Sequence, residues 1–259
     1  LSITAMVVAV GLHLSGVLSA REAFAGFVDP NVLLFMGMFV IGEAFFATGV
    51  AVGVGNVVHK FAKTETSLLV AVMMITGILS GFLSNTGTAA VLIPVIIGIC
   101  KKSGFKQTKL LMPLVFAAAM GGNISLIGAP GNMIAQAGLQ QAGLGSFNFF
   151  DYGLVGLPIL IVGTIFYATI GKRFLPDAPS HQPDGAFEGN DDYSHVPSWK
   201  KWTAAIVLIL TVVAMIFEKQ LGVKLYVSAW IGALVLVATN VISETAAVKS
   251  IDMKTIMLF

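Results

Sequence analysis

The sequence is poor in charged side chains and holds a single cysteine. Only 11% of its 259 residues are charged, whereas 56% are hydrophobic, and a soluble domain carries roughly 25% charged residues. Cys100 has no second cysteine to pair with, so a disulfide within the chain is excluded. The net charge of +2 is too small to indicate a nucleic-acid partner. The composition favours a protein whose main partner is the lipid bilayer.

Patterns that would indicate an enzyme or a bound cofactor are also missing. No cluster of His, Cys and acidic residues has the spacing of metal ligands, and no nucleophile lies in a pattern with a base. No GxxxxGK segment is present for binding phosphates. We therefore expect a protein without catalytic residues and without an organic cofactor.

Long apolar runs take up much of the chain. A helix that spans a bilayer needs about 20 apolar residues. Runs of this kind lie at 1–18, 31–56, 153–171, 203–218 and 225–241. The first has no basic leading region, so we interpret it as a spanning helix whose start is cut off rather than as a signal peptide. The runs predict an all-α, multi-pass protein of the plasma (inner) membrane.

Two further apolar regions are interrupted by polar or helix-breaking residues. Region 67–100 is interrupted at 84–88, which leaves a second arm of 12 residues, too short to cross about 30 Å of lipid. We predict a re-entrant hairpin there. Region 108–142 contains Gly121-Gly122-Asn123 and Gly128-Ala129-Pro130-Gly131-Asn132, which a continuous helix does not accommodate. We predict a broken transmembrane helix for it.

The basic residues predict how the chain lies in the membrane. Loops 57–66 and 101–109 are both rich in lysine, and a hairpin between them would leave both on the same side. The positive-inside rule makes that side cytoplasmic. Residues 176–201 are polar and rich in Pro, Gly and Asp, which is typical of a flexible linker. It follows Lys172 and Arg173, so we place it in the cytoplasm as well.

A faint internal repeat divides the chain. With an offset of 224 residues, Val17-Leu18-Ser19 aligns with Val241-Ile242-Ser243. Between the two copies the chain is predicted to cross the membrane five times, at 31–56, 108–142, 153–171, 203–218 and 225–241. Because this number is odd, the second copy is inverted relative to the first. Inverted repeats and broken helices are typical of secondary transporters. We interpret 1–175 as the first repeat and 202–259 as the first helices of a truncated second repeat.

The polar breaks offer two kinds of ligand. Ser80, Ser84, Asn85 and Thr86 carry neutral oxygens, which suit a small hard cation. The half-helices that start after Thr86 and after Pro130 would point positive N-termini into the break, where they could hold an anion. No Lys or Arg occurs at 64–100 or 110–171, so helix ends and a bound cation would have to neutralise that anion.

The segments "SNTGTAAVLIPV" and "GGNISLIGAPGN" resemble motifs of the divalent anion–sodium symporters and of the wider citrate-transporter-like ion transporter superfamily. The resemblance implies a symporter of di- or tricarboxylates or a similar oxyanion, coupled to sodium, working by elevator-like alternating access and forming a homodimer. It implies a second SNT segment near position 308, in a missing C-terminal half. By position it implies sodium-binding residues Ser80, Ser84, Asn85, Gly122, Asn123 and Gly128, and substrate-binding residues Asn85, Thr86, Pro130 and Asn132.

Other interpretations of these residues stay open at this point. Ser84-Asn85-Thr86 could form a loop between two membrane-spanning helices and cap a helix end there. The glycines between 121 and 132 could allow neighbouring helices to pack closely. Glu43 lies near the middle of the run 31–56, so it could be a coupling residue, part of a structural ion pair, or a residue at an aqueous edge. Gly131 replaces a proline that is usual in the family, which affects the substrate class. The alternative functions are an arsenite efflux protein or a sodium/proton antiporter of the same superfamily, or a channel-like membrane subunit.

Overall fold

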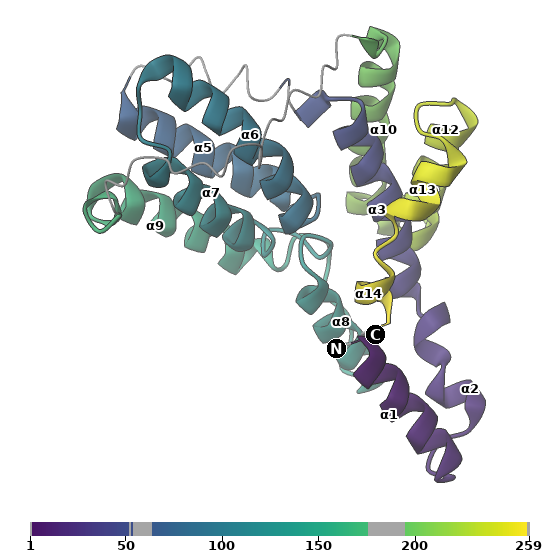
Figure 1. Ribbon diagram of the computed structural model, residues 1–259. Helices are drawn as coiled ribbons and strands as arrows, with labels where there is room; N and C mark the ends of the chain where they lie inside the picture. The colour runs from purple at the N-terminus through teal and green to yellow at the C-terminus, as the bar shows by residue number, and fades with distance from the viewer. Residues whose placement is uncertain (1, 52, 54–63, 176–194, 258–259) are drawn as a thin grey trace.

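The computed structural model describes residues 2–51, 53, 64–175 and 195–257, and every regular element in these ranges is a helix (Figure 1). The predicted all-α class is confirmed. The long helices are α1 (Ser2–Leu14), α3 (Pro30–Ala47), α5 (Glu65–Ser80), α6 (Asn85–Ser103), α7 (Thr108–Gly121), α8 (Pro130–Gln141), α9 (Gly153–Thr169), α10 (Ser198–Ile216) and α12 (Leu225–Ala238). The short ones are α2 (Ala20–Ala23), η1 (Ala25–Val28), η2 (Gly171–Arg173), α11 (Glu218–Leu221), α13 (Glu244–Ser250) and α14 (Met253–Ile256).

Helices α5, α6, α7 and α9 form one bundle, which we call the hairpin bundle. Its α5 packs against α7 and α9, and α6 packs against α7. Their apolar faces bury a shared core that includes Leu69, Met73, Leu92, Leu114 and Leu160. Figure 1 shows this bundle as a block of crossing helices on one side of the molecule.

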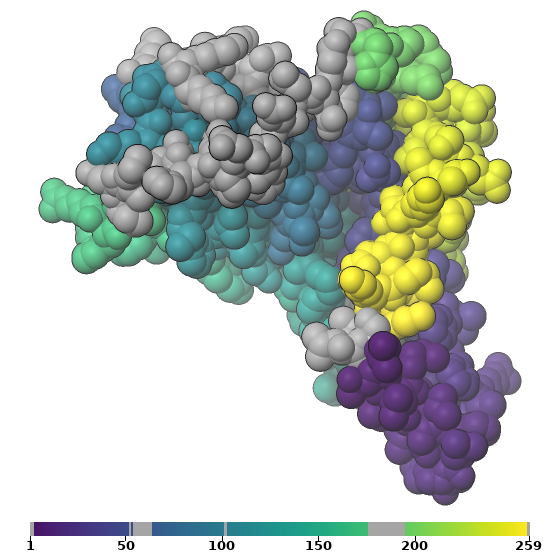
Figure 2. Space-filling view, viewed as in Figure 1, coloured from purple at the N-terminus to yellow at the C-terminus, as the bar shows by residue number. Residues whose placement is uncertain are grey.

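Helices α3, α10, α12 and α13 form a second bundle, which we call the α3 bundle. Helix α3 packs against the other three, and a Cβ at its Gly37 would lie 2.8 Å from the Cβ of Ala229, so the α3 and α12 backbones approach closely there. Leu83, between α5 and α6, and Ile127, between α7 and α8, also pack in the core of the α3 bundle. Figure 2 shows the yellow C-terminal segment along one edge, with the teal hairpin bundle on the other side.

Within the described residues, two helices are long and apolar enough to span a bilayer by themselves, namely Pro30–Ala47 and Ser198–Ile216. Several regular helices are shorter than the apolar runs that predicted them, and residues with a left-handed backbone follow three of these helices. Gly16 (φ +75°) follows α1, Gly49 (φ +75°) follows α3 and Asn240 (φ +54°) follows α12. Helices α1 and α12 therefore end a few residues before the predicted runs 1–18 and 225–241 do, whereas residues 50, 51 and 53 are helical again within the run 31–56.

The second arm of the predicted hairpin is longer than the sequence suggested. Helix α6 begins at Asn85 rather than after Thr86, because the Ser84 side chain caps it and accepts a hydrogen bond from the N–H of Gly87 (3.0 Å). Its 19 residues span about 28 Å, so length does not distinguish a re-entrant hairpin from two full spans. The hairpin topology stays a prediction.

The predicted loops and linker lie partly outside the described residues. Of loop 57–66, residues 57–63 are outside the described ranges and Glu65 already begins α5. Of the linker 176–201, residues 176–194 lie outside them, and α10 begins at Ser198, immediately after Pro197. The predicted C-terminal boundary of the linker is thus a few residues too late, because proline readily precedes the first helical turn.

Helix caps recur at the spacing of the predicted repeat. Ser19 caps α2 and accepts from the N–H of Glu22, and Ser243 caps α13 and accepts from the N–H of Ala246, each at 3.3 Å. Both pairs are 224 residues apart along the chain. Asp29 caps α3 and Asp252 caps α14 in a similar way. Asp29 and Asp252 are 223 residues apart, one fewer than the offset of the serine pair, and the internal repeat stays a prediction with which these caps agree.

Candidate functional site

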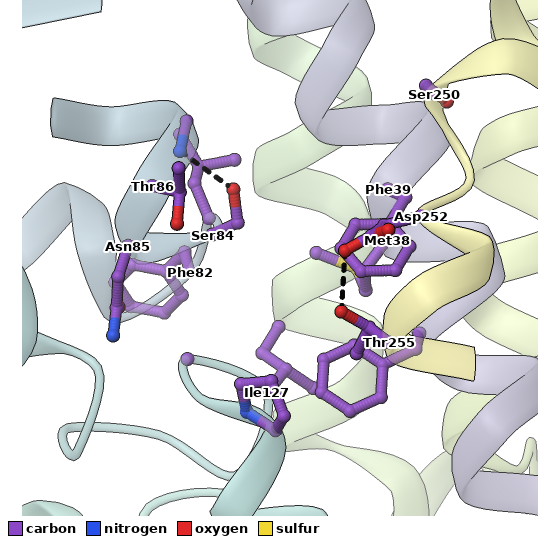
Figure 3. Close-up of a pocket in the computed structure, with 15 residues that line it drawn as sticks. Met38, Phe39, Phe82, Ser84, Asn85, Thr86, Ile127, Ser250, Asp252 and Thr255 are labelled. Atoms are coloured by element: carbon purple, nitrogen blue, oxygen red, sulfur yellow. Dashed lines mark hydrogen bonds between the residues drawn. The ribbon is translucent and has the colours of Figure 1, made fainter. Parts of the chain in front are cut away.

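A pocket of about 380 Å³ lies between the two bundles (Figure 3). One wall is the loop between α5 and α6 with the first turn of α6, where Ser84, Asn85 and Thr86 face the pocket. A second wall is the break between α7 and α8, with Gly128 and Pro130. The other walls carry aromatic and apolar residues of α3 and polar residues around α14, among them Phe35, Met38, Phe39, Ser250, Asp252 and Thr255. Both predicted breaks therefore border one space.

Two helices begin at this pocket. The Ser84 cap uses the N–H of Gly87, and among the described residues the N–H groups of Asn85 and Thr86 have no acceptor. Helix α8 begins at Pro130 after Ala129, whose side chain cannot cap a helix. Helix N-termini carry partial positive charge and free N–H donors. The pocket can therefore attract an anion, although no Lys or Arg is among its lining residues in the described part of the chain.

Three oxygen atoms gather beside the pocket around the side-chain amide of Asn85. The end of the amide that faces them lies 2.6 Å from the hydroxyl oxygen of Ser80 and 3.1 Å from each of the carbonyl oxygens of Ala118 and Gly128. The Ser80 hydroxyl also donates a hydrogen bond to the Ala118 carbonyl (2.7 Å). Ser80 is fully buried. We call Ser80 Oγ, Ala118 O and Gly128 O the oxygen cluster.

Glycine at position 122 allows the amide to lie where it does. A Cβ at Gly122 would be 2.5 Å from Oδ1 and 2.7 Å from Nδ2 of Asn85. Side chains essentially never approach so closely. A Cβ at Gly128 would likewise lie 2.5 Å from the carbonyl oxygen of Gly122. The break thus folds tightly against the first turn of α6.

Asn132, expected to bind substrate, lies inside the break rather than on the pocket wall. Its side-chain amide nitrogen donates to the backbone carbonyl oxygens of Gly122 and Ser125, each at 2.9 Å. The backbone carbonyl oxygen of Asn132 accepts a hydrogen bond from the hydroxyl of Tyr152 at 2.8 Å. The side chain is buried. The Asn132 side chain therefore stabilises the conformation of the break, and the carbonyl oxygen of Gly122 already accepts a hydrogen bond from it.

Asn123 and Glu43 lie outside the pocket lining. The Asn123 side chain is exposed, and its amide reaches the Ala119 carbonyl at 3.4 Å. Glu43 is half-buried on α3 and has no hydrogen bond or ion pair among the described residues. It lies on the same helix face as Phe39, which lines the pocket, and Phe46, which touches Gly87. Glu43 is therefore near the hairpin tip but not in the oxygen cluster.

Several residues of the site were not identified from the sequence. The Ser125 hydroxyl donates to the carbonyl oxygen of Gly81 and accepts from the N–H of Ile127, so it ties the tip of the hairpin to the break. Across the pocket, Asp252 accepts hydrogen bonds from the N–H of Lys254 (3.0 Å) and the hydroxyl of Thr255 (2.6 Å). Its carboxylate caps α14, and Figure 3 shows its hydrogen bond with Thr255 on the wall opposite the hairpin tip.

The comparisons with known proteins agree with a transporter. A family model described as "Citrate transporter" matches residues 1–259. "Uncharacterized transporter YfbS" of Escherichia coli is 34% identical over 182 residues, which is 70% of this chain and 30% of that protein. "Sodium/sulfate cotransporter 1" of Chlamydomonas reinhardtii is 28% identical over 168 residues, which is 62% of this chain and 19% of that protein.

A third relative covers more of the chain. "Uncharacterized transporter MT2759" of Mycobacterium tuberculosis is 25% identical over 254 residues, which is 95% of this chain and 58% of that protein. The chain thus spans less than two thirds of the length of each of these curated relatives.

Proposed function

The chain belongs to the citrate transporter family, and on that basis we propose that the protein is a secondary active transporter that couples the movement of a small oxyanion to sodium. The oxyanion is a di- or tricarboxylate or an anion of similar charge such as sulfate. Sodium binds at the oxygen cluster, and the anion binds in the adjoining pocket. One of the relatives is named as a sodium/sulfate cotransporter, which supports this pairing of cation and anion.

The observation that carries the proposal is the position of the oxygen cluster beside two helix N-termini. Ser80 Oγ, Ala118 O and Gly128 O converge on one point, and Asn85 and Thr86 lie next to it at the start of α6. Oxygen ligands without charge suit sodium. A cation there would add its positive charge to that of the helix ends, which would draw an anion into the pocket.

The lining residues also favour sodium over a proton as the coupling ion. The oxygen cluster contains a hydroxyl and two backbone carbonyls, none of which takes up a proton near neutral pH. The one carboxylate in the lining, Asp252, uses both oxygens to cap α14. A site built from neutral oxygens binds a metal cation by coordination. We therefore assign Ser80, Asn85, Ala118 and Gly128 to the cation, and Thr86, Pro130 and the second face of Asn85 to the anion.

Uptake into proteoliposomes tests the proposal. The full-length protein is reconstituted, and entry of radiolabelled sulfate, citrate and succinate is followed with an inward sodium gradient, with choline in its place, and with a sodium ionophore added. We expect at least one of these anions to accumulate only in the presence of the sodium gradient. Equal uptake in sodium and in choline, with loss of uptake when a proton gradient is collapsed, would contradict sodium coupling.

A sodium/proton antiporter is the second candidate, and the position of Glu43 is the observation that favours it. This carboxylate has no partner in the described part of the chain and lies on the α3 face that meets the hairpin tip. A carboxylate in this place could carry a proton. Proton efflux from the liposomes, driven by an inward sodium gradient without any labelled anion, would support this function, and an anion requirement for sodium movement would exclude it.

A further inference from the structure

The two sides of the pocket differ in the hydrogen-bonding groups that they offer. The side with the hairpin tip and the break holds the N-termini of α6 and α8, which supply free N–H donors. The opposite side carries the polar residues Ser250, Asp252 and Thr255, together with aromatic and apolar side chains of α3. Figure 3 shows Asp252 and Thr255 across the pocket from Asn85 and Thr86. A small anion in this space therefore meets two chemically different surfaces.

The hydroxyl protons on the opposite side are already used. The Thr255 hydroxyl donates to Asp252 Oδ2 at 2.6 Å, and the Ser250 hydroxyl donates to the carbonyl oxygen of Ala247 at 2.7 Å. An ionised carboxylate only accepts hydrogen bonds. These three side chains thus present oxygen lone pairs to the pocket and no donor. We call Ser250, Asp252 and Thr255 the acceptor wall.

The Asp252 carboxylate can accept further hydrogen bonds. Its Oδ1 accepts from the N–H of Lys254 at 3.0 Å, and its Oδ2 accepts from the Thr255 hydroxyl. The two oxygens of a carboxylate offer about four lone-pair sites, so each oxygen keeps one for another donor. Asp252 is exposed and lines the pocket. A ligand in the pocket can therefore reach these lone pairs.

The helix cap alone does not require the charge of Asp252. Neutral Asn and Ser cap helices about as well as Asp does, and Ser243 caps the neighbouring α13 through the N–H of Ala246. A negative charge repels an anion that enters the same pocket. This repulsion is offset when the anion brings a hydrogen-bond donor of its own to the carboxylate, because hydrogen bonds to charged groups are among the strong ones.

We propose that Asp252 determines which anions the transporter accepts, by selecting oxyanions that carry a hydroxyl, namely hydroxycarboxylates such as malate and citrate. The carboxylate end of such a ligand lies at the helix N-termini, and its hydroxyl donates to Asp252. Succinate lacks the hydroxyl and meets only lone pairs and negative charge at the acceptor wall. A site that bonds a hydroxyl rejects the analogue without it, because its own polar group then stays unpaired. This deepens the proposed function, on which it rests.

Uptake of [14C]malate and [14C]succinate by the reconstituted full-length protein tests this, at saturating sodium and at a pH where both acids are fully ionised. The two anions differ by a single hydroxyl. In wild type, we expect a KM for malate about tenfold or more below that for succinate. In Asp252→Asn, the repelling charge is gone and the amide can donate to a carboxylate. We expect the KM for succinate to fall there, and the preference for malate to shrink about tenfold.

Asp29→Asn is the matched control. Asp29 caps α3 as Asp252 caps α14, and it accepts from the N–H of Asn31 at 2.8 Å, but it does not line the pocket. The preference for malate should stay at the wild-type value in this variant. Thr255→Val is a second variant, for the case that Asp252→Asn does not fold. It removes the hydroxyl that orients the carboxylate, so the preference should shrink about threefold. A melting curve confirms that each variant is folded.

The outcomes separate this inference from the proposed function. A preference for malate that is lost in Asp252→Asn and kept in Asp29→Asn supports the selection. Equal KM values for the two anions in wild type, an unchanged preference in folded Asp252→Asn, or an equal loss in Asp29→Asn would overturn it, while sodium-coupled anion transport stands. Accumulation of [35S]sulfate without either carboxylate would do the same. If wild type accumulates none of the three anions, the proposed function fails and the inference fails with it.

Discussion

The Ser80 hydroxyl donates a 2.7 Å hydrogen bond to the carbonyl oxygen of Ala118, 38 residues further along the chain. Ser80 is the last residue of α5, and Ala118 lies in the last turn of α7. The bond therefore joins the tip of the hairpin to the end of the broken helix, where the cation is proposed to bind. Substitutions on either side of this contact should lower the affinity for sodium more than the affinity for the anion.

Replacing Ser125 by Ala should weaken the link between the hairpin tip and the break. Its hydroxyl donates to Gly81 O and accepts from Ile127 N–H in a fully buried position. Loss of such a group costs about 1–3 kcal/mol, so we expect a lower melting temperature and a higher KM for both sodium and the anion. Ser15→Ala, which removes an exposed hydroxyl, is the control and should change neither. Unchanged stability and KM in Ser125→Ala would contradict the role of this bond.

Replacing Gly122 by Ala should damage the cation site selectively. The new Cβ would lie 2.5 Å from Asn85 Oδ1, which pushes the amide away from the oxygen cluster. We expect the sodium concentration for half-maximal transport to rise about tenfold or more, since overpacking costs about 1–3 kcal/mol. Gly138→Ala in α8 is the matched control, because nothing lies within 4 Å of its Cβ. Equal sodium curves for the two variants would show that Gly122 does not support the site.

Replacing Glu43 by Gln separates sodium coupling from proton coupling. The carboxylate is near the hairpin tip but outside the pocket lining. We expect the sodium activation curve to shift by less than about twofold, because no ligand of the proposed cation is lost. The measurement is anion uptake at graded sodium concentrations. Loss of sodium-dependent transport in a folded Glu43→Gln protein would favour the antiporter alternative.

The orientation of the hairpin can be tested by cysteine labelling. Lys63, which lies outside the described residues, and Lys106 belong to the two lysine-rich loops 57–66 and 101–109. In a Cys100→Ala background, cysteines at these two positions should resist impermeant thiol reagents in intact cells and react after permeabilisation, because both loops are predicted to be cytoplasmic. Labelling of one of them from outside would reject the hairpin topology.

The sequence was most informative where polar residues interrupt apolar runs. Ser84, Asn85 and Thr86 stand in such an interruption, and Gly128 and Pro130 in another, and all five line one pocket. Such residues are conspicuous because unpaired backbone and polar groups are costly within a membrane. Their meeting in space could be expected because two breaks within fifty residues are unusual.

Other parts of the site carry no signal in the sequence. Ala118 contributes its backbone carbonyl oxygen to the cluster, so the identity of its side chain does not indicate this role. Ser125 bonds to a residue 44 positions away, and Asp252 reaches the pocket from the other bundle. Asn123 and Asn132 look alike in sequence, but the turn of the break exposes one and buries the other. Only the packing of the two bundles determines these positions.

The sodium activation curve of Asn85→Ala, measured beside its melting temperature, tests the central claim most directly. The change removes the amide that lies beside the oxygen cluster, whose oxygens carry no charge. A lost ligand of this kind is worth roughly 1–3 kcal/mol, so the sodium concentration for half-maximal anion uptake should rise about 5- to 150-fold, and raising sodium should partly restore the anion affinity. A lower melting temperature with an unshifted sodium curve in the folded variant would mean that Asn85 only shapes the hairpin, and would contradict the sodium site.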